Sequence, residues 1–306
     1  MKNEKVFNPA NRFGRVTEDW LMSVSTHVKP TTVAAYNTII KKHILPVFGN
    51  MPPRRITDAE IEEFKKQLAG TDMSPATQKN IMHVLHATVR FARRYGATAC
   101  DESFKGMAGV RPCDVPVLSD AEQNRIVSVL GENPDGKGLG VLICMYTGLR
   151  VGEICGLRWG DIEPDCRSLS VRRTVSRMRC AGGTELYVGE PKSLSSRRRI
   201  PLPATLAPIL EISRGMDDNY VVTDSPQRIP EPRNMQRYFS VLQSMAGVQP
   251  VKFHALRHTF ATRCVELGFD VKALSMILGH SNVSITLNTY VHPSFERLKT
   301  MMELLD

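Results

Sequence analysis

Signals that begin and end helices recur along this chain of 306 residues, and they limit what it can fold into more than any other feature. Thr57 and Glu60 have the spacing of a capping box. In this motif the side chain of each residue accepts a hydrogen bond from the backbone N–H of the other. Ser119 and Glu122 repeat this spacing, and Ser74 directly precedes a proline, which suits the first helical position. Apolar residues at helical spacing follow each signal, so the chain is expected to be mainly α-helical.

The first third predicts a small bundle of four helices. They are expected over residues 17–28, 29–49, 57–70 and 74–96. Thr17 is expected to cap the first helix, and Pro46 is expected to interrupt the second, because proline has no backbone N–H to donate.

The remainder predicts helices with a small sheet between them. The segments "SLSVRRTV", "TELYVG" and "RRRIPL" are rich in β-branched and aromatic residues, and we expect them to form a three-stranded antiparallel sheet. Helices are expected over residues 120–131, 138–147, 151–157, 204–213, 233–246, 254–267, 271–278 and 283–290. The fold class is therefore mainly α with a small antiparallel β-sheet, in a helical bundle followed by an α+β domain.

A break in periodicity divides the chain. Gly, Pro, Asp and Cys without a repeating apolar pattern predict a linker at 101–117. We expect a short extension at 1–14, a helical domain at 15–100, a second domain at 118–292 and a helical tail at 293–306 with one apolar face.

The composition limits the class of protein. The net charge of +9 and the pI of about 9.3 favour a polyanionic partner, although a solvated surface explains the charge equally well. Residues 1–117 hold 17 basic and 11 acidic residues, and residues 118–306 hold 23 and 20. No long apolar run or secretory signal is present, so no membrane association is expected. Seven scattered cysteines without a CxxC pair favour the reducing cytoplasm.

Unusual polar residues interrupt three apolar helical segments. His254 and Arg257 are three residues apart and would project from one helix face. Arg150 lies in a strongly apolar helix pair, and His280 and Tyr290 flank the last predicted helix. Each residue alone is more often structural than functional. Together, two arginines, two histidines and a tyrosine make a complementary chemical set.

Three motifs carry a family resemblance. "TGLRVGEICGLRW", "HALRHTFAT" and "LGHSNVSITLNTYVH" resemble, in order and spacing, the boxes of the tyrosine recombinase (phage integrase) family. The resemblance covers residues 118–292, and residues 10–100 are similar to the family's DNA-binding core-binding domain. It implies the catalytic residues Arg150, Lys192, His254, Arg257, His280 and Tyr290, supported by Glu153.

The resemblance also implies a reaction. Tyr290 would attack a DNA phosphodiester and form a covalent 3′-phosphotyrosyl intermediate, which needs no ATP, metal or other cofactor. Tyrosine ionises near pH 10, so forming phenolate at pH 7 costs about 4 kcal/mol. His254, expected to titrate near neutrality, is a candidate base, and a phosphate oxygen is the alternative. Arg150 and Arg257 would clamp the phosphate, and Lys192 would protonate the leaving 5′-oxygen.

The implied biology is a site-specific recombinase that integrates or excises a mobile element. "TLNTYVH" favours integrases of phages and conjugative elements, and the short segment before the first helix leads us to expect no separate arm-binding domain. Expected partners are double-stranded DNA recombination sites, three further copies in a tetramer joined through the tail, and possible accessory DNA-bending or excision factors. The location would be the bacterial cytoplasm, with the nucleoid.

Four alternatives stay open. A recombinase that resolves chromosomes or plasmids and a type IB topoisomerase would use the same chemistry. A non-catalytic DNA-binding regulator would explain the charge but not the set of polar residues. A metal site at His254, His258 and Cys264 lacks a glutamate between the histidines.

Overall fold

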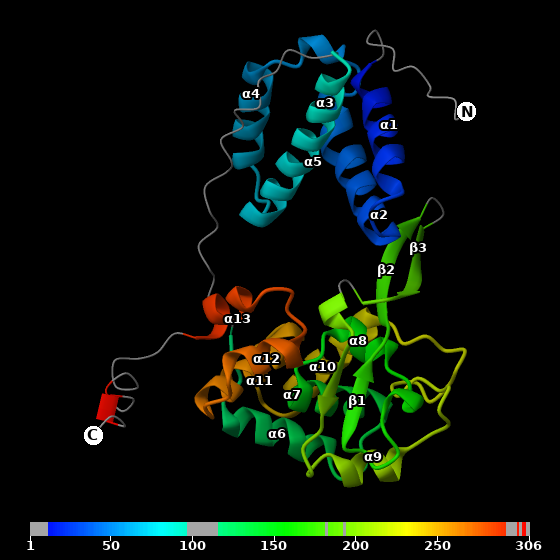
Figure 1. The fold of residues 1–306 in the computed structure, drawn as a ribbon, viewed down its shortest axis with the longest axis vertical. Helices are drawn as coiled ribbons and strands as arrows, with labels where there is room; N and C mark the ends of the chain where they lie inside the picture. The colour runs from blue at the N-terminus through cyan, green and yellow to red at the C-terminus, as the bar shows by residue number, and fades with distance from the viewer. Residues whose placement is uncertain are drawn as a thin grey trace. The chain divides into compact units, whose positions relative to one another are not determined.

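The computed structural model describes residues 12–96, 116–180, 183–191 and 194–291, together with Lys299, Met302 and Glu303 (Figure 1). The described chain is mainly helical with small antiparallel sheets, which confirms the expected fold class. It divides into two compact units, one of residues 1–113 and 178–185 and one of residues 114–177 and 186–306. Most of the linker predicted at 101–117 and of the tail at 293–306 lies outside the described residues.

The N-terminal unit packs its helices around one apolar core. Its helices are α1 (Phe13–Ser25), α2 (Pro30–Ile39), α3 (Leu45–Phe48), α4 (Asp58–Ala69) and α5 (Pro75–Arg94). Phe48 contacts the rings of Phe13 and Phe64 edge to face, and so joins α1, α3 and α4. The capping box of Thr57 and Glu60 is present, and Ser74 caps α5 as expected.

Two details of this unit differ from the sequence prediction. The first helix begins at Phe13, so Thr17 does not cap it; the Thr17 hydroxyl instead donates to the Gly14 carbonyl at 2.7 Å. Pro46 does not interrupt the second helical region. A π-helical turn over Ile40–Ile44 leads directly into α3, whose first turn contains the proline. The π-helical turn changes the hydrogen-bond register just before Pro46, so the proline falls in the first turn of α3, where its missing N–H is tolerated.

The C-terminal unit holds the larger core. Its helices are α6 (Asp120–Leu130), α7 (Gly136–Thr147), α8 (Val151–Gly156), α9 (Ala207–Ser213), α10 (Pro232–Met245), α11 (His254–Glu266), α12 (Val271–Leu278) and α13 (Val283–Tyr290). Helix α7 is buried along most of its length and packs against α8, α10 and α11. Cys144 of α7 and Cys155 of α8 are buried free thiols that fill this core.

The strands form two separate ladders, so the predicted three-stranded sheet is wrong. Strand β1 (Ser168–Val171) pairs with β4 (Arg198–Pro201), and β2 (Thr174–Cys180) pairs with β3 (Gly183–Gly189). The segment "SLSVRRTV" therefore contributes to two ladders. The chain leaves the first ladder at Arg172 and Arg173, whose side chains both pair with the buried carboxylate of Asp161. An alternation pattern cannot reveal this ion pair, because Asp161 is distant in the sequence.

No helix in the described part of the chain is long and apolar enough to cross a membrane.

Candidate active site

Arg150 lies where α7 ends and α8 begins. Gly148 ends α7 with a φ of +64°, and a Cβ at this position would lie 2.6 Å from a ring carbon of Phe260. Only glycine combines this left-handed backbone with so close a neighbour. Arg150 then precedes the first turn of α8, where its backbone N–H and its Nη1 both donate to the Glu153 carboxylate, at 3.0 and 2.8 Å. The tight turn therefore sets the direction of the Arg150 side chain.

Arg257 joins the ends of two helices. Its side chain is buried, and its Nη1 and Nη2 donate to the carbonyls of Gly148 and Leu278 at 2.8 and 2.9 Å. These carbonyls lie at the C-termini of α7 and α12, where the helix dipole is negative and a cation is favoured. Burial, with the nearby charge of Arg150, lowers the pKa of Arg257 to about 10, so the guanidinium stays charged at neutral pH.

His280 is held in one tautomer. Its Nε2 lies 2.8 Å from Arg257 Nη2, and its Nδ1 lies 2.8 Å from the hydroxyl of Thr286 on α13. A guanidinium has only donors, so Nε2 must accept, and Nδ1 must carry the proton that it donates to Thr286. Burial, and then the charges of Arg257 and Arg150, lower the pKa of His280 to about 4. The ring is therefore neutral at pH 7.

Tyr290 ends α13 beside these groups. Its ring is buried, lies 5.3 Å from the ring of His258 and stacks nearly parallel to His280 at 6.4 Å. Burial raises the pKa of Tyr290, although Arg257, by charge and by hydrogen bond, and Arg150 oppose this effect. The phenol is therefore protonated at neutral pH, with two guanidinium groups near enough to favour its anion.

His254 is the first residue of α11 and meets His258 ring to ring at 4.7 Å, in a T-shaped contact. Loss of water around the ring, followed by the charges of His258, Arg257 and Arg150, lowers the pKa of His254 to about 4. The neutral-range pKa expected from the sequence is therefore wrong, because burial and neighbouring cations disfavour the imidazolium.

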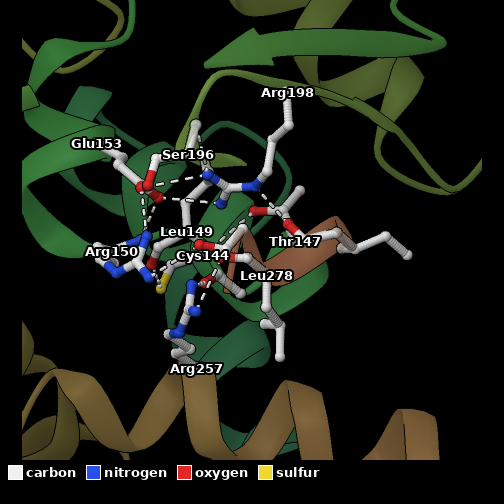
Figure 2. A network of polar contacts seen from close by, with 12 residues as sticks. Cys144, Thr147, Leu149, Arg150, Glu153, Ser196, Arg198, Arg257 and Leu278 are labelled. Atoms are coloured by element: carbon white, nitrogen blue, oxygen red, sulfur yellow. Dashed lines mark hydrogen bonds and ion pairs between the residues drawn. The ribbon is translucent and has the colours of Figure 1, made fainter. Parts of the chain in front are cut away.

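Glu153 has a second partner that sequence reasoning missed. Arg198, the first residue of β4, donates from Nη1 and Nη2 to the two Glu153 oxygens at 3.2 and 3.1 Å (Figure 2). Burial alone raises the pKa of Glu153, but Arg198 and then Arg150 outweigh it and hold the pKa below its usual value. Arg198 belongs to the "RRRIPL" stretch, where strand alternation places it on the face of the buried Ile200, whereas Arg199 is exposed.

The structure thus brings together the candidate residues Arg150, Glu153, His254, Arg257, His280 and Tyr290, from α8, α11, α13 and the turns between helices. Lys192 lies outside the described residues. Arg150 and Arg198 share the one carboxylate of Glu153, and Arg257 adds a further charge, so positive charge is in excess, which suits a phosphate.

The depressed histidine pKa values predict how stability depends on pH. The pKa values of His254 and His280 are about 4 in the folded chain, against about 6.5 for a histidine side chain in water. Between these values the unfolded chain binds more protons, so stability should fall as the pH drops from about 6.5 toward 4. His280→Asn removes one of these titrations and should flatten the decline. Urea unfolding of both chains across this range gives the free energy of unfolding at each pH. If it falls equally steeply with pH in His280→Asn and in the wild-type chain, the lowered pKa of His280 would be contradicted.

Comparisons with known proteins identify the family. The phage integrase family matches residues 117–297, more than half of the chain, and the phage integrase N-terminal SAM-like domain matches residues 12–69. A XerC-like tyrosine recombinase of Caldanaerobacter subterraneus is 29% identical and covers 91% of this chain and 78% of the relative. The ICEBs1 integrase of Bacillus subtilis is 24% identical, covering 94% of this chain and 80% of the relative.

Solved structures agree on the fold. The Tn1549 transposon integrase in complex with a circular intermediate DNA has a TM-score of 0.79 at 22% identity, covering 97% of this chain and 100% of that chain. A lambda integrase tetramer bound to a Holliday junction has a TM-score of 0.66 at 18% identity, covering 94% and 80%. With most of both units matched in sequence and fold, the chain belongs to the phage integrase family of tyrosine recombinases.

Proposed function

We propose that this chain is a site-specific DNA recombinase in which Tyr290 attacks a DNA phosphodiester and becomes joined to the 3′-phosphate, releasing a 5′-hydroxyl. The observation that carries the proposal is the position of Arg257. One buried cation ties the turn before Arg150 to His280, directly beside the Tyr290 ring. A phenol close to fixed positive donors is the combination that this reaction requires. Attack by the freed hydroxyl of another strand reverses the step and exchanges strands.

The two arginines would carry most of the electrostatic work. The transition state gains negative charge on the non-bridging oxygens, where guanidinium groups offer paired, permanently charged donors. Fixed donors of this kind need no reorganisation during the reaction, because Arg257 is already held by helix ends and Arg150 by Glu153. The same charges would also lower the cost of ionising Tyr290.

The proton of Tyr290 needs an acceptor. His254, with a pKa near 4, is neutral at pH 7 and can accept, although weakly. A bound phosphodiester adds negative charge beside the ring and raises its pKa toward neutrality, which makes His254 a better base when DNA is bound. His280, whose Nε2 accepts from Arg257, would hold that guanidinium at the phosphate. Lys192 would protonate the leaving 5′-oxygen.

The proposal extends to partners and biology. Double-stranded DNA would be bound by both domains, the helical domain at 15–100 and the catalytic domain at 118–292, and four copies would assemble on two sites through the tail at 293–306. The ICEBs1 and Tn1549 integrases and the lambda tetramer on a Holliday junction support this proposal. We propose integration or excision of a mobile element, with accessory factors, in the bacterial nucleoid; resolution of chromosomes or plasmids is the runner-up.

A covalent capture experiment tests the function and finds the target DNA sequence at the same time. The chain is mixed with a library of nicked duplexes whose central sequence is randomised, because loss of a short fragment at the nick traps the intermediate. Protein–DNA adducts are isolated under denaturing conditions, the attached DNA is sequenced, and the modified peptide is mapped by mass spectrometry. We expect attachment at Tyr290 and an enriched sequence. Adducts without any sequence preference would favour a topoisomerase, and no adduct would contradict the proposal.

Cleavage is expected to survive EDTA. The described side chains around the site are guanidinium, imidazole and phenol groups, and both oxygens of Glu153 accept hydrogen bonds from arginines. Such a set does not suit Mg²⁺, which prefers carboxylate and other oxygen ligands. The duplex enriched in the capture experiment is called the captured duplex below. Its adduct yield should be unchanged in excess chelator, and a Mg²⁺-dependent nuclease serves as the positive control for chelation. Loss of the adduct in EDTA, restored by added Mg²⁺, would contradict this mechanism.

A further inference from the structure

The two arginines that share Glu153 hold it in different ways. Arg198 grips the carboxylate as a fork, with one guanidinium nitrogen on each oxygen, at 3.2 and 3.1 Å. Arg150 makes one side-chain bond, from Nη1 to Oε1 at 2.8 Å, while its backbone N–H donates to Oε2. The side chains of Glu153 and Arg198 are 3% and 7% exposed, whereas that of Arg150 is 38% exposed. The buried pair is therefore Glu153 with Arg198, and Arg150 lies at its solvent edge.

Arg198 is fixed from several directions. Its Nε donates to the carbonyl of Ile277 near the end of α12, and its Nη1 also donates to the carbonyl of Ser196 at 3.1 Å. Gly279 makes room for it, because a Cβ there would lie 2.9 Å from Arg198 Nη1. Figure 2 shows the Arg198 guanidinium beside the Glu153 carboxylate. Arg198 therefore cannot turn toward a substrate without breaking these contacts.

The geometry implies a competition for one carboxylate. A guanidinium and a carboxylate pair best through two parallel hydrogen bonds. If the Arg198 fork were absent, Glu153 could offer both oxygens to Arg150, whose second side-chain contact is only a long one, from Nη2 to the Gly279 carbonyl at 3.4 Å. A bidentate pair would neutralise Arg150 and turn its donors away from the phosphate.

We infer that Arg198 is a positioning residue for strand cleavage: by occupying Glu153 with its own fork, it keeps Arg150 directed at the scissile phosphate. This inference rests on the proposed function and adds to it a residue that never touches the DNA. Arg198 acts through Glu153 on Arg150, so its effect should depend on both partners.

The test measures single-turnover cleavage of the captured nicked duplex. Arg198→Lys keeps the charge but replaces the fork with a point donor, and should slow cleavage about tenfold. The double variant with Glu153→Gln should regain at least half of the lost rate, measured as the logarithm of the cleavage rate, because a neutral amide does not form a bidentate ion pair with Arg150. In an Arg150→Ala background, Arg198→Lys should cause no further loss. Arg199→Lys is the matched control, since this neighbour is exposed and pairs with Glu163.

The outcomes separate the inference from the proposed function. If Arg198 were merely structural, the double variant Glu153→Gln with Arg198→Lys should cleave more slowly than Arg198→Lys alone. Arg198→Lys should then also slow cleavage further in the Arg150→Ala background. Either result overturns the inference. If Arg198→Lys does not fold, as thermal unfolding would show, Arg198→Gln combined with Glu153→Gln removes opposite charges together. That variant should cleave clearly faster than Arg150→Ala, and equal rates would overturn the inference. Absence of any adduct from the wild-type chain would instead refute the function.

Discussion

Tyr290→Phe is expected to abolish covalent attachment to DNA and to leave DNA binding intact. The substitution removes only the hydroxyl, which is the atom that would bond to phosphorus. The phenylalanine ring keeps the contacts with His258 and His280, and Arg150 and Arg257 remain to bind the phosphate. A denaturing gel of chain and captured duplex measures attachment, and a native titration measures affinity.

Controls make this result specific. Tyr146→Phe removes the hydroxyl of an exposed tyrosine on α7 and should form adduct at the wild-type rate. The affinity of Tyr290→Phe for the uncut duplex should stay within about threefold of wild type, since no charge is changed. An adduct that persists in Tyr290→Phe would mean that another residue is the nucleophile, and the assignment of Tyr290 would be wrong.

Arg150→Ala should give the second large effect, a loss of about 100- to 1000-fold in the rate of cleavage, as for removal of one fixed donor from a developing oxyanion. Arg150 is a better target than Arg257, because Arg257 also holds the backbone carbonyls of Gly148 and Leu278. After Arg150 is removed, Glu153 keeps its fork with Arg198, so no buried charge loses its partner.

Single-turnover cleavage of the captured duplex measures this loss, and the thermal unfolding midpoint shows whether the fold is kept. Arg150→Lys should lie between wild type and Arg150→Ala, because lysine keeps the charge but lacks the planar pair of donors. A duplex whose scissile phosphate is replaced by a neutral methylphosphonate should narrow the difference between wild type and Arg150→Ala. A cleavage rate for Arg150→Ala within about threefold of wild type would contradict the proposed role.

Local signals in the sequence predicted the elements that local physics controls. The bounds of α12 and α13 agree with the prediction, because Asp270 and Asn282 cap their starts and Gly279 ends α12. The capping boxes at Thr57 and Ser119 also formed as expected. A cap depends on residues two or three positions apart, so the sequence contains all the information needed.

Predictions failed where distant residues decide the outcome. Alternation identified the strands but not their partners, because the pairing of β1 with β4 joins residues far apart in the chain, such as Leu169 and Ile200. The neutral pKa expected for His254 failed because burial and the charge of Arg257, which the fold supplies, shift it.

The sequence by itself determined the helical class, the family and which side chains are chemically complementary, because each of these depends on local spacing and residue type. Only the tertiary structure decided that Arg257 links two helix ends, that His280 carries its proton on Nδ1 and that Arg198 shares Glu153 with Arg150. Residues 45 positions apart form that last contact. Such contacts follow from how helices and strands pack, because burial and a low local dielectric favour the polar pairings that leave few buried donors and acceptors without a partner.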